Sequence, residues 1–239
     1  MQLHRLIDWI KDRKTWWMET QANGDMSPIV LAKGDGFFCV VTSPEGHKQY
    51  ALQAIEVLRT AFNPHTLVFI GDAHCDTATS IAEHQERYPN GMQHACDEDH
   101  ACATTSLSDC MMATIIRGDK HDVMTIPYAY VDHDTKREVV WNDDKMSLPF
   151  EYKSAGGQII EDERDSAVRS TRDRHMFRQM ARKMGLDPDN PNCDRAIQSA
   201  AINYLLEMGY VIEDEAEFRR TIFLPQGERK LSHKPEFAH

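Results

Sequence analysis

The sequence predicts an α+β fold, with a mostly antiparallel sheet flanked by helices and followed by a small, mainly helical C-terminal region. Three observations predict it. Apolar residues recur at helical spacing in the segments 3–20 and 47–61. Short apolar runs bounded by turn residues follow each of these segments, and helical spacing returns after residue 167.

The N-terminal part predicts a helix followed by a hairpin. Residues 3–20 should form an amphipathic helix that ends before Asn23-Gly24. The apolar runs 29–32 and 37–42 are joined by four residues that include two glycines, which supply the positive φ of a tight turn. These two runs should therefore pair as antiparallel strands.

A first domain, residues 1–145, adds a second helix and more strands to the same sheet. The helix at 47–61 stops at Asn63-Pro64, and the apolar run 66–70 predicts a short buried strand. Three further runs separated by turns predict an antiparallel meander: residues 111–117, 123–130 and 137–141.

The residues beyond this domain predict a connection and a helical region. Acids, a Gly-Gly pair and weak periodicity over residues 146–166 indicate a linker or extended arm. The region 167–239 should be mainly helical and end in a flexible tail. Its expected elements are helices at 168–184 and 193–208, with Asn192 as N-cap and Gly209 just past the C-terminus, and a strand at 220–224.

The overall charge and the apolar patterning limit the compartment and the partners. With 27 basic and 38 acidic residues, the net charge of -11 opposes attraction of the whole surface to nucleic acid or anionic lipid. No apolar run approaches the roughly 20 residues that cross a bilayer, and no secretory signal is visible. We therefore expect a cytoplasmic protein that does not bind a membrane.

A loop rich in histidine, cysteine and acids is expected between residues 74 and 110. Four of the six cysteines fall there. Zinc takes about four such ligands in a tetrahedron, and the residues expected to bind it are His94, Cys96, His100 and Cys102, with His74, Cys75 and Cys110 as further candidates. The one-residue spacing within each pair is shorter than in most structural zinc sites. The alternative interpretation is a solvated polar loop without metal.

A zinc-dependent hydrolase that uses the cluster between His74 and Cys110 is the enzymatic alternative. It would need an open coordination position on the zinc. Gly71-Asp72 resembles the Gly-Asp motif of calcineurin-like metallophosphoesterases, but the later Gly-Asn-His motif of that family is absent. The His-x-His of JAMM-type metalloproteases is absent as well. The sequence contains no complete catalytic motif.

A third interpretation is a DNA-associated regulator. The predicted helix 168–184 carries several arginines, among them Arg172 and Arg178, which could form a basic face. Because Asp165 and Asp173 are interleaved with these arginines, an ordinary solvated face is the simpler interpretation. Nucleic acid is therefore expected to bind through this helix or not at all.

The leading interpretation is binding to another protein. The first helix carries Trp9, Trp16 and Trp17, and tryptophan is enriched among the residues that anchor interfaces. The segments 68–73 and 124–130 resemble those of uncharacterised proteins of actinobacteria and their phages, as does the segment 139–143. This resemblance implies a phage or mobile-element origin, and it identifies no catalytic residue and no mechanism. We therefore expect an intracellular accessory or regulatory protein that binds another protein and holds a structural zinc.

Overall fold

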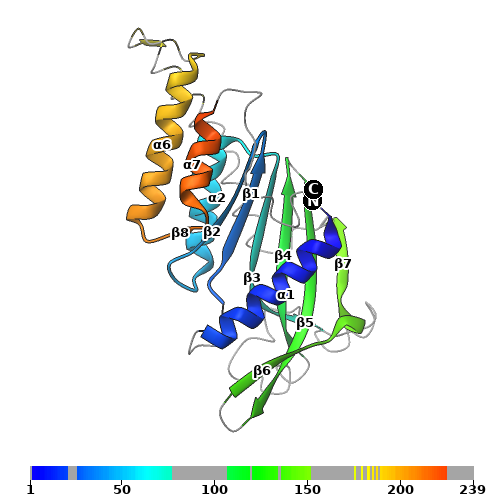
Figure 1. Ribbon diagram of the computed structural model, residues 1–239. Coiled ribbons are helices and arrows are strands. Elements are labelled where there is room, and N and C mark those ends of the chain that lie inside the picture. The colour runs from blue at the N-terminus through cyan, green and yellow to red at the C-terminus, as the bar shows by residue number, and fades with distance from the viewer. Residues whose placement is uncertain are drawn as a thin grey trace, which may run out of the picture.

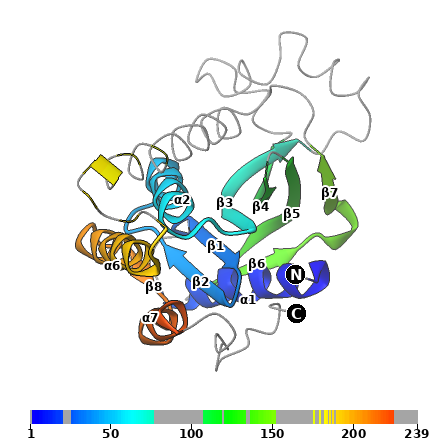
Figure 2. The same ribbon diagram turned by 90° about the horizontal axis from the view of Figure 1, so that it is seen from above.

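A computed structural model gives the architecture of the chain. The described residues are 2–20, 26–76, 107–118, 120–133, 136–151, 175, 179, 182–183, 185, 187 and 189–224. They form one large sheet with helices on both faces, as Figures 1 and 2 show. The predicted α+β fold with a mostly antiparallel sheet is confirmed.

Eight strands make up the sheet in the described part of the chain, and all of their pairings are antiparallel. Their order is β6-β5-β4-β3-β1-β2-β8, and β7 pairs with β5. The strands are β1 (Ile29–Gly34), β2 (Phe37–Thr42), β3 (Thr66–Asp76), β4 (Leu107–Arg117), β5 (Lys120–His133), β6 (Lys136–Trp141), β7 (Ser147–Glu151) and β8 (Val211–Ile212). In Figure 1, β5 and β6 extend below the other strands as a two-stranded ribbon.

The described helices divide between the two faces of the sheet. One face is covered by α1 (Leu3–Thr20), and the other is packed against α2 (Lys48–Phe62), α6 (Pro191–Glu207) and α7 (Glu215–Phe223). Figure 2 shows α1 and α2 on opposite sides of the strands. A short 3-10 helix, η2 (Asp143–Lys145), follows β6. None of the described helices is long and apolar enough to span a membrane.

Each face of the sheet has its own hydrophobic core because successive strand residues point to opposite sides. In β1, Val30 and Ala32 belong to the core under α2, whereas Ile29 and Leu31 belong to the core under α1. All four side chains are buried. This explains why β1 is an unbroken apolar run instead of an alternating one.

The C-terminal helices pack into the same core as α2. Ile202 and Leu205 of α6 are fully buried there, and so are Phe218 and Ile222 of α7. The predicted helical C-terminal region is thus present in the described residues. It shares a hydrophobic core with the sheet, since it has too little apolar surface of its own to bury its helices.

Most local predictions agree with the structure. The first helix has the predicted bounds, and the hairpin turns at Gly36, whose φ is +71°. The second helix begins and ends one residue later than predicted. Gly209 follows α6 with a φ of +85°, as expected for a glycine just past the end of a helix.

Two local predictions were wrong. Residues 220–223 of the predicted strand 220–224 belong to α7 instead, where Arg219 pairs with Glu215 one helical turn away. The N-cap of α6 is Asn190 and not Asn192, because Pro191 takes the first helical position and the Asn190 side chain accepts a hydrogen bond from the Asn192 backbone.

Long-range pairing also extends the sheet beyond the predicted runs. β3 continues from the predicted strand 66–70 to Asp76 because it pairs with the start of β4 at Leu107. The ends of the segment predicted as a loop, residues 74–76 and 107–110, are therefore strand. β7 lies at the start of the segment predicted as a linker or arm; residues 152–166 lie outside the described part of the chain.

Candidate functional site

The predicted metal ligands are only partly within the described residues. His94, Cys96, His100 and Cys102 lie outside them. The backbones of His74 and Cys75 belong to β3, and Cys110 is a buried residue of β4 that pairs with Ala73. Among the residues that the structure describes, no group of three or more histidines, cysteines and acids could hold a metal ion. Arg172 and Arg178 also lie outside the described residues.

The three predicted interface tryptophans lie on α1 and take different positions. Trp16 is 47% exposed, whereas Trp9 and Trp17 are half-buried and pack against the core under α1. The indole Nε1 of Trp17 is buried and has no hydrogen-bond partner among the described residues. Trp17 therefore contributes mainly to packing, and Trp16 is the tryptophan that α1 presents to solvent.

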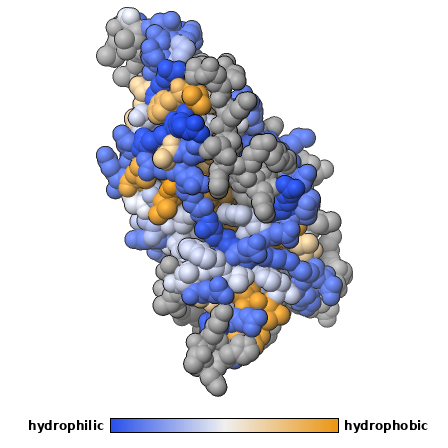
Figure 3. Space-filling view, in the orientation of Figure 1, coloured by the Kyte–Doolittle hydropathy of each residue, from blue (hydrophilic) through white to orange (hydrophobic). Residues whose placement is uncertain are grey.

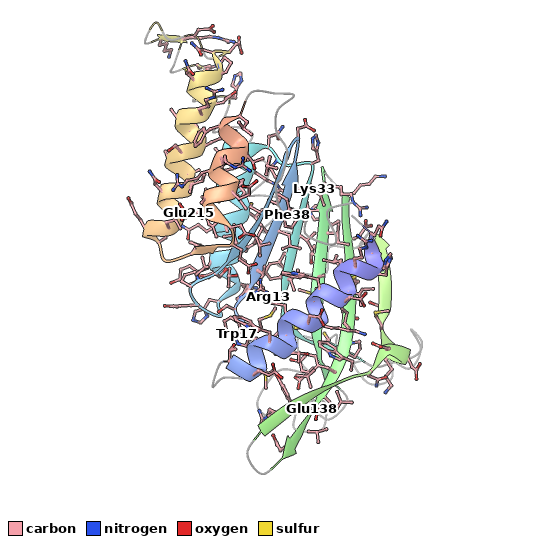
Figure 4. The ribbon with its side chains drawn as sticks, viewed as in Figure 1. Arg13, Trp17, Lys33, Phe38, Glu138 and Glu215 are labelled. Carbon is pink, nitrogen blue, oxygen red and sulfur yellow. The ribbon has the colours of Figure 1, made fainter. Side chains whose placement is uncertain are left out.

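Arg13 holds the exposed tryptophan in place. Its guanidinium carbon lies 5.1 Å from the ring centre of Trp9 and 5.4 Å from that of Trp16, within the range of cation–π contacts. The same guanidinium forms an ion pair with Glu213, which precedes α7. Burial lowers the pKa of Arg13. Figure 4 labels Arg13 and Trp17 in the C-terminal half of α1.

Acidic side chains lie along the outer side of α1, beside Trp9, Arg13 and Trp16. Asp8, Asp12 and Glu19 are exposed, and their spacing of four and seven residues places them along one ridge of the helix. In Figure 3 the front of α1 is a mixture of blue and nearly white residues, without a continuous hydrophobic patch. The outer surface of α1 thus combines one exposed indole with negative charge. We call Asp8, Asp12, Trp16 and Glu19 the α1 surface.

A buried lysine lies on the opposite side of the same helix. Lys14 has no exposed surface, and its ammonium donates to both carboxylate oxygens of Asp72, at 2.9 and 3.0 Å. It also donates to the hydroxyl of Tyr130 at 3.1 Å, and it lies 5.0 Å from the ring centre of Tyr128. A buried ammonium needs such partners, because leaving it unpaired inside the protein costs roughly several kcal/mol of folding free energy.

Two further donors complete the shell around Asp72. The hydroxyl of Tyr128 donates to Oδ1 at 2.7 Å, and the backbone N–H of Met26 donates to Oδ2. Burial, and then the negative charge of Asp72, raise the pKa of Tyr128 well above its ordinary value, so this hydroxyl keeps its proton. The network connects α1, β3 and β5 and fixes the position of α1 on the sheet.

The lysine of this network is not accessible to a substrate. Lys14 is fully buried and makes all of its described contacts inside the protein. The buried thiol of Cys39 is also unsuited to nucleophilic chemistry, since burial raises its pKa to about 12. The described residues therefore favour a structural role for Lys14 and for Cys39.

Sequence reasoning named Trp16 among three candidate tryptophans, but it did not find the contact of Trp16 with Arg13 or the ion pair that holds α1 on the sheet. Lys14 and Asp72 are 58 positions apart, and Arg13 and Glu213 are 200 positions apart. A lysine at position 14 does fall on the apolar side of the predicted helix, 4 residues after Ile10. That position was the available sign that this lysine is buried.

Comparisons with known proteins identify no relative. No protein-family model matches the chain, and no curated protein or solved structure matches it. The function is therefore inferred from the chemistry of the described residues.

Proposed function

We propose that the protein is an accessory or regulatory protein that acts by binding another protein through the α1 surface. The observation that carries this proposal is Trp16, a large indole that is 47% exposed yet held by Arg13. Tryptophan is enriched among the residues that dominate binding energy at interfaces. An exposed indole already held in one orientation loses little side-chain entropy when a partner covers it.

The charges around Trp16 indicate the chemistry of the partner. Asp8, Asp12 and Glu19 are exposed on the same helix, and the whole chain carries a net charge of -11. A partner with a basic surface around an apolar pocket would complement both features. Long-range attraction of this kind mainly raises the rate of association and weakens with added salt.

The network beneath α1 supports the same proposal. Lys14 and Asp72 hold the helix on the sheet from below, so the exposed side chains share a rigid support. Rigid presentation lowers the ordering cost of binding. A fully buried lysine with three oxygen contacts is better suited to this support than to contact with a substrate.

The test compares Trp16→Ala with a matched variant outside the α1 surface. Met208→Ala is the control, since Met208 is 42% exposed beside α6. A partner captured by the wild-type chain and then purified should bind Trp16→Ala at least about tenfold more weakly, and Met208→Ala with unchanged affinity. Equal binding by both variants would show that α1 is not the contact.

A second measurement tests the charge. Asp8→Lys with Asp12→Lys should slow association with the purified partner and flatten its dependence on salt, with a smaller effect on dissociation. An exposed acid on the opposite face of the sheet provides the control: Asp194→Lys, in α6, should leave the association rate almost unchanged. Identical salt dependence in wild type and the α1 double variant would contradict the proposed basic partner.

The structural zinc site belongs to the same proposal. We expect about one zinc per chain when the protein is purified without a histidine tag, and its loss in a variant that combines Cys96→Ser with Cys102→Ser. Cys193→Ser is the control, because this cysteine is about 90 positions from the cluster in the sequence and belongs to α6. Elemental mass spectrometry and a free-thiol count give the result. Absence of zinc together with reactive thiols would remove the site from the proposal.

A further inference from the structure

The sheet ends at β6, which pairs with β5 and with no other described strand. In Figure 1 the ribbon formed by β5 and β6 extends below the other strands. One face of this ribbon lies against α1, where Tyr130, Val139 and Trp141 pack on the core under that helix. A helix on the face of a strand leaves the edge of that strand unpaired. Among the described residues, the outer edge of β6 is therefore open.

The backbone of β6 turns alternate residues toward this open edge. The N–H of Asn142 donates to the carbonyl oxygen of Pro127 at the start of the β5–β6 pairing, at 2.9 Å. Hydrogen-bonded residues alternate along an antiparallel pair, so Val140 also turns its backbone groups toward β5. Val139 and Trp141 then turn their N–H and C=O groups outward. Such a row of outward groups is a template for a further strand.

The second half of β6 lacks the usual protection of an edge strand. Natural edge strands are commonly blocked by charged side chains or proline. Residues 139–141 are instead Val-Val-Trp, and the side chain of Val140 is 48% exposed. Val131 of β5 is 41% exposed on the same face of the ribbon, because it pairs with Glu138, two residues before Val140. An open edge beside exposed valines favours pairing with another chain.

The charges around β6 are self-complementary when the strand direction is reversed. Residues 136 and 137 are basic, residues 139–141 are apolar, and residues 143 and 144 are acidic. Two copies of this segment running antiparallel therefore bring the basic start of one beside the acidic end of the other. Arg137 and Asp143 already form ion pairs within their own chain, with Asp132 and Lys11. The charge pair between copies is thus expected from positions 136 and 144.

We propose that β6 pairs antiparallel with β6 of a second copy of this chain, about a two-fold axis at Val140. Val140 then lies opposite its own copy in a non-hydrogen-bonded pair, with Cα atoms about 4.5 Å apart. Val139 forms a hydrogen-bonded pair with Trp141 of the second copy, which uses the outward backbone groups of both residues. Position 136 lies opposite Asp144 of the second copy. The two sheets become one continuous sheet.

The symmetry of this contact limits the assembly to a dimer. Both copies use the same strand, so the contact is isologous and closes with two copies. Each chain carries a net charge of -11, which opposes association at long range. At about 0.15 M salt the screening length is about 8 Å, so the local complementarity at β6 outweighs the repulsion between the rest of the two surfaces. The contact is independent of the α1 surface.

The experiment measures self-association of the full-length protein by analytical ultracentrifugation in about 0.15 M salt. We expect a reversible monomer–dimer equilibrium. Val140→Lys places two ammonium groups directly opposite each other and should weaken the dimer at least about tenfold. Val211→Lys is the matched control, because Val211 is a 59% exposed valine of β8, at the other end of the same sheet. It should dimerise like the wild type.

A charge exchange tests the register. Lys136→Glu and Asp144→Lys should each weaken the dimer severalfold, and the variant that combines them should recover the affinity of the wild type. Hydrogen exchange adds a backbone measurement: the amides of Val139 and Trp141 should gain protection as the protein concentration rises, whereas the amide of Val140 should not. Circular dichroism checks the folding of each variant. If Val140→Lys does not fold, the charge exchange and the hydrogen exchange decide the outcome.

Four results would overturn the proposal. The wild type could stay monomeric up to about 200 µM, a concentration that detects even a weak dimer. Val211→Lys could weaken association as much as a folded Val140→Lys does. Association could continue beyond the dimer, which would indicate head-to-tail pairing of β6 with β8. The charge exchange could fail to restore the affinity, which would exclude a two-fold axis at Val140.

Discussion

The two faces of the sheet are held to their helices in different ways. Under α2, α6 and α7 the contacts are mainly apolar, with Phe37, Phe62 and Phe218 forming a ring cluster whose centres are 5.2 to 5.8 Å apart. Under α1 the apolar core surrounds the ion pair of Lys14 and Asp72. Apolar packing is non-directional, whereas a buried ion pair requires one geometry.

This difference indicates a division of roles. Among the described residues, the core on the face with three helices contains five buried aromatic residues and the core under α1 contains two. Such packing contributes stability in proportion to the area removed from water. The ion pair under α1 adds little net stability compared with apolar residues of the same size, but it specifies where α1 lies. That specificity matters for a helix whose outer side we propose to be the contact surface.

The largest expected effect comes from leaving Lys14 without its carboxylate. Asp72→Ala should lower the free energy of unfolding by about 3–5 kcal/mol, because a fully buried ammonium then lacks its counterion. Urea denaturation followed by circular dichroism measures the loss. The double variant that combines Asp72→Ala with Lys14→Met should recover much of it. A loss below about 1 kcal/mol in the single variant would contradict the role of the pair.

The pH dependence gives the next effect. The pKa of Tyr128 is raised in the folded state, so the protonated phenol favours folding; this contribution is complete below the unfolded pKa of about 10 and is lost as the pH rises above it. Tyr128→Phe should lower the free energy of unfolding by about 1.5–3 kcal/mol at neutral pH, and above about pH 10 this free energy should decrease less in the variant than in the wild type.

Tyr210 on the other face is the matched control for this pH effect. Burial raises its pKa to about 12, and its hydroxyl donates to the backbone oxygen of Tyr50. The raised pKa of Tyr210 likewise means that its protonated phenol favours folding, but no carboxylate charge contributes to the shift. Tyr210→Phe should therefore reduce the loss of unfolding free energy at alkaline pH less than Tyr128→Phe does. Unfolding curves measured between about pH 8 and pH 13 compare the two, because their responses separate only above the folded-state pKa of Tyr210, about 12. An equal response would remove the distinction between the faces.

The smallest effect should come from truncation on the face with three helices. Ile222→Val and Ile202→Val should each cost about 0.5–1.5 kcal/mol, since each removes one buried methylene. The double variant should lose about the sum of the two, in contrast to the recovery expected for Lys14→Met with Asp72→Ala. Recovery in the isoleucine pair, measured by the same urea unfolding, would show that the two faces do not differ in this way.

The sequence by itself determined the local elements of this protein. The spacing of apolar residues predicted α1 with its observed bounds, and the glycines of residues 33–36 predicted the β1–β2 hairpin. Such features depend on backbone sterics and on a periodicity of a few residues, so a short window of sequence contains them. The polar ends of β3 and β4 were missed because their pairing partners supply the strand conformation.

Only the tertiary structure decided the composition of the candidate sites. Trp16 was identifiable from the sequence, but its exposure and its contact with Arg13 depend on how α1 lies on the sheet. Asp72 follows the predicted strand 66–70 in the sequence, whereas in the structure it lies within β3 and is the counterion of Lys14. These partners are far apart in the chain, and nothing local to either residue specifies the other. Burial creates the need for a counterion, and burial is a property of the folded chain.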